Sequence, residues 1–417
     1  MNSDLPSLVH AANAGLRAGV EPVMAEDAMG GCYFLRDRSR AIQLVFKPSD
    51  EEMNAPNNST RDGKYGSAYK GRIVPGFGMY RELAAFAIDR ENFAGVPPTD
   101  ISKVRSPVLR ESSREGLGYG YKLGSIQSYV RSECSSEEMG SSKFDVGDVM
   151  RIATLDIRIC NLDRHGGNIL VSRSAPYQQT RLRRELDVKI SSEEIRSSSA
   201  PTSSNLPSVS SVRIPSTISA SSDGVPIPSY RLIPIDHGFS FPHILHLSDA
   251  TFVWLNWSQA KLPVPHEIKS FIAALDADED CSLVRRCVGA AIPETSLLSL
   301  KVCTKLLKYG IAKGKTLYEI GTLMVISEDS DISSLQRTVN VAIRKVISDI
   351  VTCTSWSSRS SPHRKSPMRG GHPQPSSSTA GISDEALQLA LSRENEAALL
   401  NEIYRGIEVL VDSCESP

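Results

Sequence analysis

The sequence predicts an α+β fold in which an antiparallel pair of strands comes early and long helices come late. Two short apolar runs, 32–35 and 41–46, flank the polar turn 37–40 and predict a β-hairpin. Apolar residues recur at helical spacing in 81–89 and 149–159. Because 40% of the 417 residues are hydrophobic, the chain can bury one large core or two smaller ones.

The second half of the chain continues this mixture of strands and helices. Short apolar runs at 169–171 and 232–235 predict strands that flank a polar site. Amphipathic helices are expected at 297–311 and 339–351, where they would complete a second, mainly helical part of the fold.

Shifts in composition mark segments outside this folded part. Residues 1–24 are expected to form an N-terminal extension. The stretch 190–229 is rich in Ser and Pro and cannot bury enough apolar surface to offset its ordering entropy, so it predicts a disordered insertion inside a domain. A second disordered linker is expected at 353–382, followed by a C-terminal helix at 383–412 with Ser383 as its N-cap.

Charge and cysteine usage restrict the class of protein. A formal net charge of −1 provides no overall field for nucleic acid, and no nucleic-acid partner is expected. The eight cysteines include no CxxC pair, which disfavours a zinc site or a disulfide framework and favours a reducing compartment. We expect neither a signal peptide nor a transmembrane segment, so the protein is either soluble or peripheral to a membrane.

The strongest chemical signal is the loop 161–168, in which Asp163 precedes Asn168 by five residues. Phosphoryl transfer needs a carboxylate that orients the attacking hydroxyl or accepts its proton, and a nearby amide oxygen that holds a metal ion. Mg²⁺ prefers oxygen ligands and keeps several waters, so one Asn and one Asp suffice when phosphates supply the rest. The alternative is an ordinary polar loop before a strand.

A second signal is Asp236, which follows the apolar run 232–235 and precedes Gly238 by two residues. Kinases place the carboxylate that grips Mg²⁺ beside the β- and γ-phosphates in such an Asp-x-Gly turn. Alone, this pattern favours a simple turn. Together with the loop 161–168, it predicts a metal ligand.

A third signal is Lys47, at the end of the second hairpin strand. A lysine that leaves a buried strand is suited to hold the α- and β-phosphates of ATP, provided that a carboxylate holds the lysine. Glu82 on the helix 81–89 is the candidate partner, and Glu51 and Glu52 are competitors. A surface lysine is the alternative.

The glycine pair at 30–31 opens the hairpin and forms a fourth, weaker signal. Two glycines let backbone N–H groups approach phosphate oxygens closely. The pair is neither GxGxxG nor a Walker motif, so an ordinary turn is the alternative.

Taken together and in order, these elements resemble the phosphatidylinositol 3/4-kinase family, and within it the type II phosphatidylinositol 4-kinases of the plant-type gamma branch. The Asp-Arg-His-x-x-Asn loop and the Asp-x-Gly turn are that family's pattern. The similarity covers roughly residues 25–350. Further matching stretches lie in 46–48, 50–52, 55–58, 81–85, 95–99, 155–159, 254–263, 275–276 and 303–307.

The resemblance implies a two-lobed protein-kinase-like fold, with a small antiparallel-sheet N-lobe at 25–126 and a mainly helical C-lobe at 127–352. ATP and Mg²⁺ would bind between the lobes. The implied roles are Lys47 for phosphate binding, Glu82 for positioning Lys47, Gly30, Gly31, Cys32, Tyr33 and Phe34 for covering the nucleotide, Gln127, Ser128, Tyr129 and Val130 for the hinge at adenine, Asp163 for catalysis, and Asn168 and Asp236 for metal binding. His165 would either share in proton transfer or stabilise charge on the moving phosphoryl group.

The chain also departs from the family. The cysteine-rich palmitoylation patch of the animal type II enzymes is missing from it. The Ser-rich insertion 190–229 separates Asn168 from Asp236 by 68 residues, so it is expected to loop out into solvent.

The activity implied is that of a phosphatidylinositol 4-kinase, cytoplasmic and peripheral to a membrane, which makes phosphatidylinositol 4-phosphate. One alternative is a Ser/Thr protein kinase on the same fold, acting on protein substrates. A second is a non-catalytic nucleotide-binding scaffold, which the complete set of site residues disfavours.

The surface formed by residues 237–262, which follow Asp236, would indicate whether the phosphate acceptor is a lipid or a protein. A lipid head group calls for a basic, membrane-facing surface there, but Lys261 is the only full cation in 237–262. Phe252, Trp254 and Trp257 suit either a membrane interface or a core.

The tail 384–394 loosely resembles a ubiquitin-interacting helix, with an acidic start followed by Leu387 and Ala390. A plain helical tail is the alternative.

Overall fold

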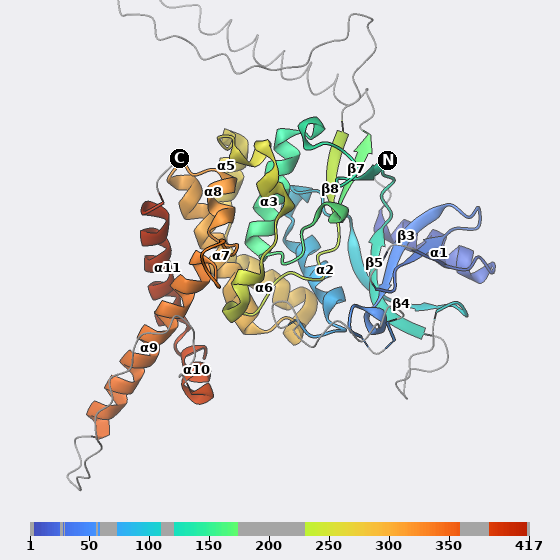
Figure 1. Ribbon diagram of the computed structural model, residues 1–417. Helices are drawn as coiled ribbons and strands as arrows, with labels where there is room; N and C mark the ends of the chain where they lie inside the picture. Colours follow the sequence, from blue (N-terminus) through green and yellow to red (C-terminus); the bar gives the residue numbers. More distant parts are fainter. Residues whose placement is uncertain are drawn as a thin grey trace, which may run out of the picture.

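The computed structural model describes residues 4–25, 28, 30–55, 57–58, 73–109, 121–173, 230–358 and 383–414. The predicted insertion 190–229 and most of the predicted linker 353–382 lie outside these residues. Figure 1 shows a sheet-rich part at one end of the molecule and a larger helical part at the other, which confirms the expected two-lobed α+β fold.

The N-lobe is built on a five-stranded antiparallel sheet with the strand order β1-β2-β3-β5-β4. The predicted hairpin forms β2 and β3, displaced by about one residue from the predicted bounds. Its turn is held by Asp37, whose side chain accepts the backbone N–H groups of Ser39 and Ala41 at 2.8 and 3.1 Å. The strands are β1 (Val23–Met24), β2 (Tyr33–Arg36), β3 (Ile42–Pro48), β4 (Thr99–Arg105) and β5 (Tyr121–Ser128).

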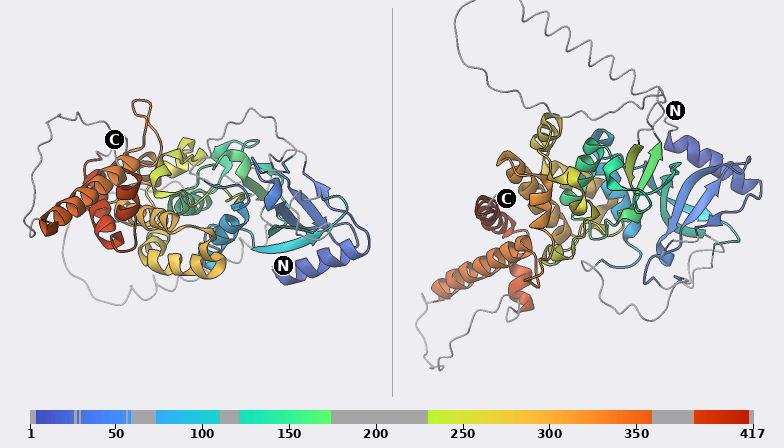
Figure 2. Two further views of the ribbon diagram at one scale, coloured as in Figure 1. Left: turned by 90° about the horizontal axis from the view of Figure 1, so that it is seen from below. Right: turned by 45° about the horizontal axis from the view of Figure 1, so that its top comes forward.

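Helix α1 (Leu5–Arg17) covers one face of this sheet (Figures 1 and 2). Side chains alternate along a strand, so Leu35, Leu44 and Phe46 all point to this face and pack against α1. The prediction that 1–24 precedes the N-lobe as an extension is therefore wrong, because α1 supplies part of the N-lobe core and β1 is an edge strand of its sheet.

Helix α2 (Gly78–Ile88) lies between the N-lobe sheet and the helices of the C-lobe (Figure 1). It confirms the predicted helix 81–89 and begins three residues earlier. Ala84 and Ala85 are fully buried, and their small side chains let α2 approach both layers closely.

The C-lobe combines a small antiparallel sheet, in the order β6-β7-β8, with a layer of helices. Strands β7 and β8 confirm the predicted runs 169–171 and 232–235, and they join the two candidate metal ligands to one scaffold. The elements are β6 (Cys134–Ser135), β7 (Ile169–Arg173), β8 (Tyr230–Pro234), α3 (Val146–Ile159), α5 (His266–Ala274), α6 (Ala277–Val288), α7 (Glu294–Ala312), α8 (Leu317–Thr322) and α9 (Ser334–Ser358). No helix among the described residues combines the length and apolar character needed to cross a bilayer.

The C-terminal region differs from the prediction in two ways. The predicted single helix 383–412 is two helices, α10 (Asp384–Ala390) and α11 (Glu396–Asp412), and α9 continues to Ser358, into the predicted linker. Both C-terminal helices pack against α9, at the end of the molecule opposite α1 (Figure 2). Ala390 is fully buried in the C-lobe core, so this position of the loosely matching ubiquitin-interacting pattern is covered by the protein itself, and the alternative of a plain helical tail is favoured.

Candidate active site

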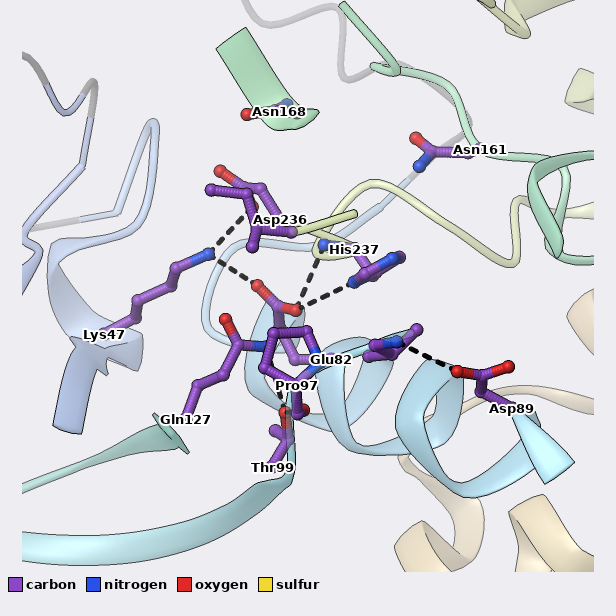
Figure 3. Close-up of polar contacts among 12 residues, drawn as sticks. Lys47, Glu82, Asp89, Pro97, Thr99, Gln127, Asn161, Asn168, Asp236 and His237 are labelled. Carbon is purple, nitrogen blue, oxygen red and sulfur yellow. Dashed lines mark hydrogen bonds and ion pairs between the residues drawn. The ribbon is translucent and has the colours of Figure 1, made fainter. Parts of the chain in front are cut away.

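Lys47 lies at the centre of the site and contacts two carboxylates. Its neighbour Phe46 is buried under α1, so alternation along β3 turns the lysine to the opposite face of the sheet. Its Nζ lies 2.6 Å from Glu82 Oε1 and 3.1 Å from Asp236 Oδ1 (Figure 3). The structure therefore brings together three predicted site residues from β3, α2 and the turn after β8.

Glu82 is almost fully buried, and both of its oxygens are engaged. Oε2 accepts the backbone N–H of His237 at 3.1 Å and lies 3.5 Å from Nδ1 of the same residue. Burial by itself would raise the pKa of Glu82, but the charge of Lys47 and the hydrogen bond from His237 outweigh it and hold that pKa well below its usual range.

The pKa of Lys47 moves in the opposite direction. Burial would lower it, but the carboxylates of Asp236 and Glu82 outweigh burial and raise the pKa. Both members of the Lys47–Glu82 pair therefore stay charged at neutral pH.

Glu51 and Glu52, the competing partners, are engaged elsewhere. Glu51 pairs with the buried ammonium of Lys122 at 2.5 Å. Glu52 accepts the backbone N–H groups of Gly76 and Gly78 at the start of α2, at 2.7 and 3.2 Å. Both acidic side chains thus organise the segments around the site rather than its lysine.

The loop before β7 holds Asp163 and Asn168 in a fixed relation. The backbone N–H of Asp163 donates to Asn161 Oδ1 at 2.9 Å, and Asn168 Nδ2 donates to the Asp163 carbonyl at 3.0 Å. Because the amide nitrogen of Asn168 is committed in this way, its oxygen is directed elsewhere and is the atom suited to a metal ion.

Arg164 ties this loop to the turn that carries Asp236, a role that the sequence analysis missed. Its buried Nε lies 3.0 Å from both carboxylate oxygens of Asp156. Its Nη1 donates to the carbonyl oxygens of Asn168 and Ile235 at 2.6 and 2.7 Å. A detectable signal was Asp156 itself, since a carboxylate among the apolar positions of helix 149–159 needs a buried donor.

Asp236 follows β8 in a left-handed backbone conformation, with φ of +58°. A non-glycine residue is uncommon in this region, and such strain gathers at functional sites. The preceding residue, Ile235, donates its N–H to the Asn168 carbonyl at 3.0 Å. The two candidate metal ligands are therefore linked through adjacent backbone groups.

His165 lies at the edge of the site with about half of its side chain exposed. Its Nε2 is 4.0 Å from Asp163 Oδ2, and its Nδ1 is 3.3 Å from Glu137 Oε1. Nδ1 also accepts the backbone N–H of Gly167 at 3.1 Å. Nδ1 thus faces both a carboxylate and a backbone N–H, while Nε2 is the ring nitrogen on the side of Asp163.

The glycine pair 30–31 contacts protein groups rather than offering both N–H groups to a phosphate. The N–H of Gly31 donates to the Glu51 carbonyl at 2.9 Å. A Cβ on Gly31 would lie 2.2 Å from Glu51 Oε2 and 2.6 Å from Glu51 Cβ, so the close contact with this side chain requires glycine. The expectation that this N–H approaches a phosphate is corrected accordingly.

The residues after the glycine pair divide between the two faces of the sheet. Tyr33 belongs to the α1 core and donates its hydroxyl to Glu51 Oε2 at 2.8 Å, so it does not cover a nucleotide as predicted. Phe34 points to the other face, where its ring meets that of Tyr129 with centroids 5.7 Å apart. Cys32 lies near Lys47, and burial raises the pKa of its thiol to about 11.

The predicted hinge, 127–130, comprises the last two residues of β5 and the two residues that follow it. Gln127 is held by its side chain, whose Nε2 donates to Thr99 Oγ1 at 3.0 Å (Figure 3). The N–H groups of Ser128 and Tyr129 donate to protein carbonyls at 2.9 and 3.0 Å. An adenine contact by this stretch therefore has to use other backbone groups, such as those of Val130.

The aromatic residues after Asp236 belong to the core. Phe252, Trp254 and Trp257 are all nearly or fully buried in the C-lobe cluster. The ring N–H of Trp254 donates to Asp156 Oδ2 at 3.0 Å, which links this aromatic core to Arg164. Between the two readings that the sequence left open, the structure favours packing over a membrane interface.

Comparison with known proteins gives one matching family model, described as phosphatidylinositol 3- and 4-kinase, which covers residues 28–320. Phosphatidylinositol 4-kinase gamma 3 of Arabidopsis thaliana is 34% identical over 79% of this chain and 52% of its own length. Phosphatidylinositol 4-kinase gamma 4 of the same plant is 31% identical over 82% of this chain and 52% of its own length. The gamma 4 protein of Oryza sativa subsp. japonica is 32% identical over 79% and 50%. The chain spans about half the length of these curated relatives.

Proposed function

The chain belongs to the phosphatidylinositol 3- and 4-kinase family, and we propose that it transfers the γ-phosphate of ATP to the 4-hydroxyl of phosphatidylinositol. The observation that carries this proposal is the contact of Lys47 with both Glu82 and Asp236. A lysine held by one carboxylate beside a second carboxylate suits a triphosphate that binds together with a metal ion.

The donor groups fit a magnesium-bound nucleotide. Lys47 would hold the α- and β-phosphates, and the oxygens of Asn168 and Asp236 would hold Mg²⁺, which prefers such ligands. The metal, when bound, neutralises charge on the phosphates. Glu82 fixes the direction of Lys47. Arg164 fixes the spacing of the two metal ligands through the backbone carbonyl of Asn168 and that of Ile235, next to Asp236.

Asp163 is proposed to orient the acceptor hydroxyl and to take up its proton. Its side chain is about a quarter exposed, so an acceptor can reach its oxygens, while its backbone is hydrogen-bonded on both sides. His165 directs Nε2 towards the same carboxylate and is proposed to stabilise charge there.

The lipid acceptor is inferred from the names of the relatives, which are phosphatidylinositol 4-kinases. A membrane lipid as substrate requires access to a bilayer surface, and we propose that the chain works there as a peripheral protein on the cytoplasmic side. Protein Ser/Thr hydroxyls are the second candidate acceptor. The observation that favours them is the burial of Phe252, Trp254 and Trp257, since these side chains offer no membrane-facing aromatic surface.

The test is transfer from γ-labelled ATP with Mg²⁺ to phosphatidylinositol vesicles, with a mixture of soluble proteins as the competing acceptor. We expect label in phosphatidylinositol 4-phosphate, and none with Asp236→Asn. Label that appears only on protein would replace the lipid by the second acceptor. Absence of transfer to either, with normal folding, would favour the non-catalytic scaffold and refute the proposal.

A further inference from the structure

Helix α2, which carries Glu82, packs on the C-lobe helices as well as on the N-lobe sheet that carries Lys47. Ala85 and Ile88 of α2 are fully buried in one cluster with Leu155, Val284 and their neighbours from α3, α6 and α7. The Lys47–Glu82 pair therefore joins the two lobes, and its geometry depends on how firmly α2 is held on the C-lobe.

A buried ion-pair network holds the last turn of α2. Asp280 on α6 is fully buried, and its Oδ2 accepts from Arg158 Nη2 at 2.7 Å. Its Oδ1 accepts from Arg90 Nε at 3.1 Å and Nη2 at 2.9 Å, just beyond the end of α2. Arg158 also donates through Nη1 to the carbonyl of Ile88, the last residue of α2, at 3.4 Å.

Asp280 thus binds both Arg158 on α3 and Arg90, which follows the end of α2. A cation at a helix C-terminus satisfies carbonyl groups that lack intrahelical partners and interacts favourably with the helix dipole. Arg158 can do so only while its guanidinium is held, and Asp280 is the carboxylate that holds it. Burial lowers the pKa of Arg158, and the carboxylates of Asp280 and, more weakly, Asp89 oppose that change. Asp280 is the carboxylate that also bonds the guanidinium directly.

Hydrogen bonds to Asp89 also fix the segment that connects α2 to β4. Asp89, directly after α2, accepts the backbone N–H groups of Ala94, Gly95 and Val96 at 2.8, 3.0 and 2.9 Å. Those residues lead into β4 and place α2 at a defined distance from the sheet. A shift of α2 along its axis would have to break contacts at Asp89 and at Asp280 together.

We propose that Asp280 is a positioning residue for the nucleotide site: through Arg158 and Arg90 it holds α2 on the C-lobe, so that Glu82 remains in place to direct Lys47. This inference rests on one part of the proposed function, namely that a nucleotide binds at Lys47, and it does not depend on the acceptor.

The test measures binding of a fluorescent methylanthraniloyl-ATP with Mg²⁺, without any acceptor, to the full chain. Asp280→Asn keeps the shape of the side chain and removes its charge, and we expect affinity to fall about tenfold. Asp278→Asn is the matched control, because it lies on the same helix, is largely exposed and pairs with Lys301 instead. It should change affinity by less than about twofold.

A double-variant cycle separates positioning from general damage. If Asp280 acts through Glu82, then Glu82→Gln combined with Asp280→Asn binds no more weakly than Glu82→Gln alone. Exchange of the α2 backbone amides should be faster in Asp280→Asn, while that of the α11 amides stays unchanged. Unchanged affinity in Asp280→Asn, or additive losses in the double variant, would overturn the inference.

If Asp280→Asn does not fold, Arg90→Gln decides, because Arg90 is about one-third exposed and loses only one arm of the network. Arg90→Gln should weaken nucleotide binding about threefold, and its combination with Glu82→Gln should bind no more weakly than Glu82→Gln alone. An affinity equal to that of the wild type would contradict the proposal. Nucleotide binding without lipid kinase activity in the wild-type chain would refute the proposed function and leave this test intact.

Discussion

Lys47 and Glu82 form an ion pair that is only partly open to solvent, with exposed fractions of 25% and 3% for the two side chains. Removing one partner of such a pair leaves a buried charge without compensation. The place of Lys47 in the site was predictable from the sequence, because the lysine ends an apolar run that reads as a strand. The neighbours of Glu82 were not, since the contact with His237 joins residues 155 positions apart.

At this scale we expect Lys47→Met to abolish turnover and to lower the free energy of unfolding at pH 7 by about 2 kcal/mol. The pKa of Glu82 is lower in the folded wild type than in the unfolded chain. Glu82 therefore contributes stability above the pKa of the unfolded chain, and this contribution is lost as the pH falls below it. Without the lysine, Glu82 protonates more easily, so the difference from wild type should shrink as the pH is lowered from 7 towards 4. Urea unfolding at a series of pH values measures this, and a difference that is constant with pH would contradict it.

Asp163 and Asn168 were placed correctly in one loop from their spacing, but the groups that hold the loop were not all foreseen. The role of Arg164 was not predicted, because it donates to the carbonyl of Asn168 and to that of Ile235, and Ile235 lies 71 residues away in the sequence. Tyr33 was misplaced for a different reason. Strand alternation separates it from Phe34, and that rule needs the identity of the buried face, which α1 supplies.

Among the elements, α1 was missed as part of the N-lobe because its partner surface is formed by two strands that meet it only after folding. Gly15 marks the contact. A Cβ at this position would lie 2.0 Å from the Arg36 carbonyl oxygen and 2.9 Å from the Asp37 carbonyl carbon, both of them backbone atoms.

Gly15→Ala should therefore destabilise the protein by about 1–3 kcal/mol, although the same change in an isolated helix would stabilise it. Asn13→Ala on the exposed side of α1 is the control and should be neutral or slightly stabilising. Thermal unfolding compares the two variants. A stabilised Gly15→Ala protein would show that α1 does not pack on the hairpin in this way.

Glu52 holds the start of α2 by accepting backbone N–H groups. Burial raises the pKa of Glu52 to about 7, although hydrogen bonds from Gly76 and Gly78 oppose this. An acid with a raised pKa in the folded state binds its proton more tightly there than in the unfolded chain. Its contribution to stability therefore falls as the pH rises from about 4.5 to 7.

Glu52→Gln removes this titration, so its stability relative to the wild type should improve by roughly 2–3 kcal/mol between pH 4.5 and pH 8. Chemical unfolding of both proteins at several pH values provides the comparison. Parallel pH profiles would show that Glu52 is not the buried acid described above.

The break between α10 and α11 illustrates why element boundaries escape sequence reasoning. Residues 391–395 contain neither Gly nor Pro, the strongest signals for the end of a helix, and Arg393 and Asn395 are weaker ones. The turn is stabilised by Asn395, whose Nδ2 donates to the Leu389 carbonyl at 2.9 Å. Packing of both helices on α9 then decides the geometry.

For the whole molecule, the two lobes were predictable from the order of strands and helices, whereas the extent of the C-lobe core was not. Leu399, Ile403, Ile407 and Val411 of α11 are fully or almost fully buried in that core. Their spacing was visible as a helical period, but nothing in the sequence identified the surface that they cover.

Ile403→Ala should consequently lower the free energy of unfolding by about 2–5 kcal/mol, because it removes buried methyl groups and leaves a cavity. Val409→Ala on the same helix is the control. Its side chain is 70% exposed, and the change should cost less than about 0.5 kcal/mol. Equal stabilities of the two variants would indicate that α11 is not docked on the C-lobe.

The central claim is that Lys47, Asp163, Asn168 and Asp236 converge on one magnesium-bound triphosphate. Single-turnover transfer by Asp163→Asn, measured alongside its affinity for the fluorescent nucleotide, tests this most directly. We predict at least a hundredfold slower transfer with an affinity within about threefold of the wild type, because Asp163 acts on the acceptor and not on ATP. Transfer at the wild-type rate by a folded Asp163→Asn protein would contradict the claim.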